Sequence, residues 1–168
     1  MNKPLNAYKA LIAQLSGIEK NLLSAHRRQI TCSKGCFECC KLGSAFAVEA
    51  AVIRKASRRL SGKARGLISE NGKKRTGYCP YLIGGACSIY VSRPVICRTH
   101  GYPLMIGGKI TFCGMNFKKV KTISANCITD LGRLNVALAA INIAYLKATG
   151  EKRVRIPLRS IIKEIARG

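Results

Sequence analysis

The stretch Cys32-Ser-Lys-Gly-Cys36-Phe-Glu-Cys39-Cys40 holds four of the nine cysteines of this 168-residue chain. The CxxC spacing of Cys36 and Cys39 lets two thiolates reach one metal ion from a single turn. Cys32 adds a third thiol at a four-residue step, and Gly35 gives the intervening backbone freedom to fold around the ion. Thiolate ligation favours zinc or an iron–sulfur cluster over hard cations. This stretch therefore predicts a metal centre in a loop.

The fourth ligand of such a centre must come from another part of the chain. Adjacent cysteines usually point in different directions, so we expect one of Cys39 and Cys40 to bind this metal and the other to pack or to serve a second site. One site is favoured over two. The candidates for the fourth ligand are Cys79, Cys87 and Cys97, and the candidates for a second site, or spare residues, are Cys113, Cys127 and His100.

The cysteine count and the N-terminal sequence favour reduced thiols. Nine is an odd number, and Met1 to Leu15 has no compact apolar stretch of the kind that signal peptides carry. No run approaches the roughly 18 apolar residues that a membrane span needs. We therefore expect a cytoplasmic protein with no membrane partner, and we disfavour a framework of disulfides.

The hydrophobic pattern predicts a mainly α protein with small β-hairpins (α+β), its helices packed around an irregular, cysteine-rich metal centre. We expect a single domain over residues 1–168 with a cysteine-rich core at 30–130. Apolar residues at three- and four-residue steps predict a helix near 46–60, and glycines limit a following helix to 63–70. Paired glycines at 84–85 and 107–108 predict two hairpins. Three further helices are expected at 4–28, 128–148 and 157–166.

The net charge of +23 is unevenly distributed. Residues 32–53 sum to zero, whereas residues 54–75 carry nine bases against Glu70. Such a basic segment attracts polyanions such as nucleic acid or an acidic protein. Few aromatic side chains are available to stack on bases, and a solvated basic face explains the same pattern. The candidate nucleic-acid contacts are Arg54, Lys55, Arg58, Arg59, Lys63 and Arg65.

Several separated motifs together resemble the YkgJ-like cysteine-cluster proteins, which are described as zinc- or iron-chelating domains. The motifs are CxxxCxxCC at 32–40, Cys79-Pro-Tyr-Leu, Gly85-Ala-Cys87-Ser-Ile-Tyr90 and Arg93-Pro94-Val-Ile-Cys97-Arg98, and the resemblance covers roughly residues 30–130. The first spacing here is three residues, where many relatives have two. The resemblance implies that the metal-binding set is Cys32, Cys36, Cys39, Cys40, Cys79, Cys87 and Cys97.

Three functions are compatible with these features. The first is a metalloprotein with a Cys-ligated iron–sulfur cluster ([4Fe–4S]) or Zn²⁺, acting in electron transfer or metal handling. Nearby bases at Lys34, Lys41, Arg93 and Arg98 would favour either metal centre. The second is a basic nucleic-acid- or protein-binding module with structural zinc. The third is a protein-modifying enzyme, because a similar domain occurs in flagellin lysine N-methylases. No acid–base or nucleophile–base pair is visible for it. If the chain is an enzyme, an iron–sulfur oxidoreductase is the other candidate, because some relatives are labelled so.

Overall fold

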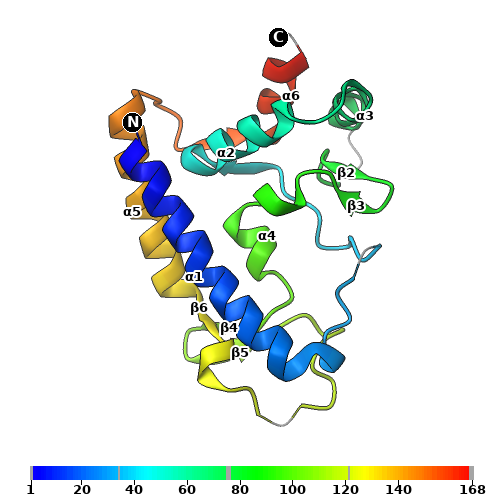
Figure 1. The fold of residues 1–168 in the computed structure, drawn as a ribbon, viewed down its shortest axis with the longest axis vertical. Helices are drawn as coiled ribbons and strands as arrows, with labels where there is room; N and C mark the ends of the chain where they lie inside the picture. The colour runs from blue at the N-terminus through cyan, green and yellow to red at the C-terminus, as the bar shows by residue number, and fades with distance from the viewer. Residues whose placement is uncertain (1, 34, 75–76, 121, 167–168) are drawn as a thin grey trace. The chain divides into compact units, whose positions relative to one another are not determined.

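The computed structural model describes residues 2–33, 35–74, 77–120 and 122–166, so Lys34 lies outside the described residues. The protein is 56% helical, with small sheets of two or three strands, which confirms the expected fold class. The α-helices are α1 Asn2–His26, α2 Ala47–Arg58, α3 Gly62–Lys73, α4 Val95–Thr99, α5 Leu131–Thr149 and α6 Leu158–Ala166 (Figure 1). The 3₁₀ turns are η1 Arg27–Gln29, η2 Tyr90–Ser92 and η3 Ala125–Cys127.

Seven short strands form three sheets. β1 Ser44–Phe46 pairs antiparallel with β7 Arg155–Pro157, and β2 Leu82–Ile83 pairs antiparallel with β3 Ala86–Cys87. The third sheet has the order β5-β4-β6, in which β4 Leu104–Ile106 pairs antiparallel with β5 Lys109–Thr111 and parallel with β6 Thr129–Asp130. No helix in the described part of the chain is long and apolar enough to cross a membrane.

The chain divides into two compact units, which are described separately. The first unit comprises Met1–Ser33 and Val95–Ala144, and the second comprises Lys34–Pro94 and Tyr145–Gly168. The single domain expected over residues 1–168 stays a prediction.

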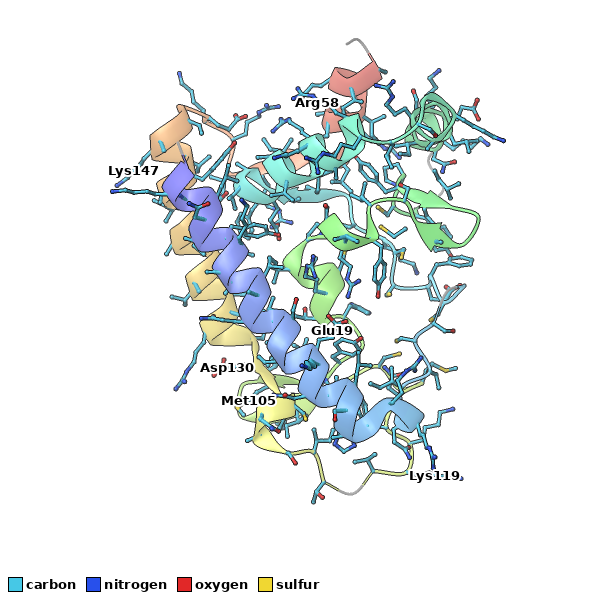
Figure 2. All side chains as sticks on the ribbon, in the orientation of Figure 1. Glu19, Arg58, Met105, Lys119, Asp130 and Lys147 are labelled. Carbon is cyan, nitrogen blue, oxygen red and sulfur yellow. The ribbon has the colours of Figure 1, made fainter. Side chains whose placement is uncertain are left out.

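The first unit is built on α1, which contacts η3 and α4. The predicted apolar stripe of this helix is real, since Tyr8, Leu11, Leu15 and Leu22 are buried. Near the C-terminal end of α1, the buried residues of this unit form a small hydrophobic cluster of Leu22, Ile30, Phe117 and Cys127. The Tyr102 hydroxyl donates to the carboxylate of Glu19, which lies on α1 (Figure 2).

The second unit contains the larger hydrophobic core. α2 packs against α6 and the β1–β7 ribbon, and α3 packs against α6 and β2. The core includes Ile53, Ile68, Tyr81 and Ile161, which are almost fully buried. Glu49, in the first turn of α2, accepts a hydrogen bond from the Phe46 backbone N–H (3.0 Å), which satisfies one donor at the start of this helix.

Most of the predicted elements are present, with one clear correction. Both hairpins form at their Gly-Gly pairs, and residues 35–43 are loop and turns as expected. The expected limit of the helix at 63–70 was wrong, because α3 continues through Gly66 and Gly72 to Lys73. A β-carbon on Gly72 would lie 3.6 Å from Ile162 Cδ1, an ordinary van der Waals distance, so this part of α3 packs against α6. Tertiary packing thus offsets the low helix propensity of glycine.

Candidate metal centre

The backbone of the second unit joins the loop that carries Cys39 and Cys40 to the hairpin that carries Cys79 and Cys87. The backbone N–H of Cys79 donates to the carbonyl oxygen of Cys40 (2.7 Å). Cys79 in turn accepts from the N–H of Leu82 (3.1 Å), and Leu82 lies opposite Cys87 in the β2–β3 register. Residues separated by almost 40 positions are therefore neighbours here.

The glycine turn of the β2–β3 hairpin lies against the loop that carries Cys36 and Cys39. Gly84 and Gly85 both have positive φ (55° and 73°), a conformation that glycine adopts without steric cost. A β-carbon on Gly85 would lie 3.6 Å from Gly35 Cα and 3.7 Å from the Phe37 ring. The Phe37 ring also contacts the Tyr78 ring edge-on, with centroids 5.6 Å apart. These contacts hold the loop between Cys36 and Cys39 against the hairpin.

Three of the thiols in this unit are half-buried and close enough to influence one another. Burial raises the pKa of Cys79 to about 11 and also raises the pKa of Cys87 and Cys40. The neighbouring Cys87 and Cys36 thiols raise the pKa of Cys40 further, while a hydrogen bond with Cys39 lowers it. A bound metal must displace the proton from each thiol that it takes as a ligand.

A buried base lies beside this group. Arg93 is only 7% exposed, and its guanidinium carbon lies 3.8 Å from the centroid of the Tyr90 ring. Its positive charge opposes the effect of burial on the pKa of Cys87. Lys41 approaches the face of Tyr78, with Nζ 5.8 Å from the ring centroid. Of the four bases expected near the cysteines, Arg93 and Lys41 thus belong to this unit, whereas Arg98 belongs to the first unit.

The second unit contains five of the seven cysteines implied by the resemblance. Cys40, Cys79 and Cys87 are half-buried, and Cys36 and Cys39 are exposed. In the described residues, no group of three His, Cys, Asp or Glu side chains is already arranged to hold a metal ion. The donor set fits a soft metal, because it consists of thiols with a nearby cation. Four sulfur ligands at about 2.3 Å from one ion require these thiols to draw closer together.

The remaining cysteines lie in the first unit. Cys32 and Cys113 are half-buried, Cys97 is exposed on α4, and Cys127 is buried in the small cluster of this unit. His100 is exposed, and His26 lies in the last turn of α1 with its ring 6.0 Å from the Phe117 ring. Ligation by Cys32 and Cys97, and a second site at Cys113, Cys127 or His100, stay predictions.

The basic residues of α2 and α3 are mostly exposed. Arg54 is the exception, because its guanidinium forms two hydrogen bonds with the Glu164 carboxylate (2.7 and 3.2 Å). Arg58 lies at the end of α2 (Figure 2). The exposed bases in the predicted set are Lys55, Arg58, Arg59, Lys63 and Arg65.

Sequence comparison adds independent support for a metal-binding role. Residues 31–127 match the family model CxxCxxCC, described as "Putative zinc- or iron-chelating domain". The chain belongs to this family. The matched segment includes all nine cysteines, and membership supports metal binding in general without selecting the metal. No curated protein and no solved structure matches the chain.

The structure also identifies a residue, Asn116, that no sequence pattern marks as part of a site. Asn116 is 1% exposed, and its side-chain amide contacts Cys32, Thr31 and Gly101 in the first unit. A single asparagine between Met115 and Phe117 belongs to no recognisable spacing. Its role depends on tertiary contacts between residues more than 80 positions apart.

Proposed function

We propose that this protein binds an iron–sulfur cluster or a zinc ion through cysteine thiolates and acts in electron transfer or metal handling in the cytoplasm. The ligands within the second unit are Cys40, Cys79 and Cys87, with Cys36 or Cys39 as the fourth. The observation that carries the proposal is the approach of the cysteine loop to the β2–β3 hairpin, together with the Cys79–Cys40 backbone hydrogen bond of 2.7 Å.

The residue types limit the chemistry of the centre. Thiolates stabilise soft metal ions, and a bound iron–sulfur cluster supplies one-electron chemistry that these side chains lack. The contribution of the protein is to bring the thiols together, to exclude water around Cys79 and Cys87, and to place the Arg93 cation beside them. Four thiolates around Zn²⁺ carry two net negative charges, so a buried guanidinium favours the loaded state.

The metal is identified by anaerobic purification followed by a visible spectrum and elemental analysis. An iron–sulfur centre gives charge-transfer absorption with iron and acid-labile sulfide, whereas a zinc centre gives a colourless protein with tightly held zinc. The proposal is contradicted by a folded, fully reduced protein that retains neither metal after reconstitution with each of them.

Substitution of an exposed cysteine tests the ligand assignment. We expect Cys36→Ser to lose the metal and to lower the melting temperature, because metal affinity and folding are linked. Cys127→Ser is the control for metal content alone, since Cys127 is buried in the small apolar cluster of the first unit and a hydroxyl there lowers the melting temperature by itself. Full metal content with unchanged melting in Cys36→Ser would remove this residue from the ligand set.

Exposed bases on consecutive helices favour a second candidate function, the binding of nucleic acid or an acidic protein. Lys55 and Arg58 on α2 and Arg59 at its C-cap are followed by Lys63 and Arg65 on α3, and all five are exposed. Binding to a labelled RNA that weakens steeply with salt, and that is lost when these five residues become Gln, would support it. Binding unaffected by the five substitutions would exclude this surface.

A further inference from the structure

Cys32 and Cys113 approach the same small space in the first unit. A β-carbon on Gly101 would lie 3.2 Å from the Cys32 sulfur and 3.6 Å from the Cys113 β-carbon. Gly101 has φ +88°, and a β-carbon there would be crowded by the Cys32 sulfur, so the two cysteines flank the backbone of this glycine closely. The Cys113 N–H also donates to the Gly101 carbonyl oxygen (3.4 Å), which ties the second cysteine to the same position.

The segments that carry these two cysteines are fastened side by side. The Phe117 N–H donates to the carbonyl oxygen of Gln29 (2.8 Å). The backbone N–H and the hydroxyl of Thr31 both donate to Asn116 Oδ1, each at 2.9 Å. The Thr31 hydroxyl is also 3.2 Å from the Met115 carbonyl oxygen. Residue 32 therefore has little freedom to move away from residue 113.

The buried amide of Asn116 also fixes the sulfur atom of Cys32. Asn116 Nδ2 donates to Cys32 Sγ (3.4 Å) and to the Gly101 carbonyl oxygen (2.8 Å). The Asn116 side chain thus contacts Cys32 and Gly101. The Asn116 backbone N–H donates to the Cys113 carbonyl oxygen (2.8 Å). Cys32, Gly101 and Cys113 therefore all contact this one asparagine.

From this geometry we propose that Cys32 and Cys113 form a redox-active dithiol that closes to a disulfide by exchange with a small disulfide such as oxidised glutathione. The Cys32 thiolate attacks one sulfur of glutathione disulfide, whose S–S bond breaks and releases one glutathione thiolate. The Cys113 thiolate then attacks Cys32 Sγ, breaks the mixed disulfide and releases the second. Two electrons pass from the protein to glutathione, and the protons of the two protein thiols end on the released glutathione.

The inference goes beyond the proposed function and can fail independently of it. Both cysteines lie within the first unit, whereas the thiols on which the proposed metal centre is argued lie in the second. Oxidation would remove Cys32 from the thiolates that the family resemblance assigns to the metal. A soft metal could shield the thiol, so the test is made in the presence of a chelator.

Peptide mapping of the full-length protein can distinguish this disulfide from every other pairing. The reduced chain is incubated with oxidised glutathione and EDTA, blocked with an alkylating agent and cut with trypsin. Cleavage after Lys and Arg leaves Cys32 alone in peptide 29–34 and Cys113 alone in peptide 110–118, whereas Cys127 falls in 122–133. We expect 29–34 linked to 110–118 as the dominant disulfide, released by a reductant.

Two variants complete the test. In Cys113→Ser the linked pair is expected to disappear, with peptide 29–34 carrying glutathione instead, while the matched control Cys127→Ser keeps the link. The wild-type map alone can overturn the proposal, whether or not either variant folds. It does so if Cys32 pairs with another cysteine, or if it stays glutathionylated while Cys113 remains reduced.

Discussion

Cys79 in the second unit and Cys32 in the first lie in different surroundings, although Cys32 also packs against the small apolar cluster of its unit. In the second unit, Cys79 and Cys87 pack against a large apolar core, and burial raises the pKa of both thiols. In the first unit, Cys32 contacts a buried amide, that of Asn116, which donates to its sulfur atom. An apolar surrounding stabilises the protonated thiol until a metal replaces the proton, whereas a fixed amide holds a sulfur atom in one position.

This difference indicates that the cysteines of the chain do not all share one kind of environment. A thiol held against an apolar core gains most from neutralisation of its charge by a metal ion. A thiol held by a polar network next to a second thiol is placed for exchange with that partner. The contrast can be tested with substitutions that affect one unit and leave the other unchanged.

The largest effect is expected from Cys79→Ser. Cys79 links the cysteine loop to the hairpin and is a proposed ligand in the second unit. Its loss should remove the bound metal and with it several kcal/mol of metal-linked stability, about the scale seen when a structural metal site is broken. Metal content by elemental analysis and thermal unfolding measure both quantities. Cys113→Ser is the matched variant of the first unit, and equal metal loss in both would erase the contrast between the units.

A smaller but clear destabilisation is expected from Asn116→Ala in the first unit. The substitution removes the side-chain partner of the part-buried Thr31 N–H and of the buried Gly101 carbonyl oxygen, which keeps only the long bond from the Cys113 N–H. We expect a loss of about 2–3 kcal/mol in the free energy of unfolding, measured by urea titration.

The control for this variant is Asn135→Ala, since Asn135 is an exposed residue of α5 in the same unit. Its effect should stay within about 0.5 kcal/mol. If Asn116→Ala is as mild as this control, the polar network does not stabilise the first unit.

The parts of the structure that could be predicted from the sequence are those with a local sequence signal. The long helices follow from apolar residues at three- and four-residue steps, and the two hairpins from their Gly-Gly pairs. The β1–β7 ribbon was not predicted, because strands of three residues show no usable alternation and the partners are separated by more than 100 positions. The parallel pairing of β4 with β6 was missed because β6 has only two residues, and α4 was missed because five residues show no helical repeat.

The candidate metal site could be predicted from the sequence only in part. The CxxxCxxCC stretch and the hairpin predicted that Cys79 and Cys87 lie close together, and the β2–β3 register brings their segments together. The sequence could not distinguish Cys32 from Cys36, because spacing alone says nothing of burial or of tertiary hydrogen bonds. Asn116 carries no local signal, so its contact with Cys32 required the structure.

A polar pair in the apolar core of the second unit gives a third, smaller test. The Tyr81 hydroxyl lies 2.9 Å from Ser57 Oγ, which also donates to the Ile53 carbonyl oxygen. Tyr81→Phe removes one buried hydrogen bond and should cost about 1 kcal/mol in the free energy of unfolding near pH 7. Tyr78→Phe is the control, because the Tyr78 hydroxyl is exposed and bonds to Glu38.

The alkaline dependence of stability adds a second measurement on the same variant. Burial raises the pKa of Tyr81 to about 12, above the value of about 10 in the unfolded chain. The stability that Tyr81 contributes is therefore complete below pH 10 and is lost as the pH rises toward 12. The difference in unfolding free energy between wild type and Tyr81→Phe should shrink over this range. A constant difference would contradict the assignment of this titration to Tyr81.

The smallest effect is expected at the surface of the second unit, where Glu164 on α6 accepts two hydrogen bonds from Arg54 on α2. Glu164→Gln should cost about 0.5 kcal/mol in low salt and less in high salt, because solvent screens this partly exposed pair.

The acid dependence of this pair follows from the direction of its pKa shift. The Arg54 guanidinium lowers the pKa of Glu164, so the stability it contributes is present above the unfolded pKa of about 4.3 and is lost as the pH falls through the lower folded value. Urea titrations at pH 7 and pH 3 measure the change, with Glu70→Gln as the control on an exposed carboxylate. If Glu164→Gln lowers the free energy of unfolding equally at pH 7 and pH 3, its effect comes from altered packing between α2 and α6. The Arg54–Glu164 ion pair would then contribute nothing to the stability of the second unit.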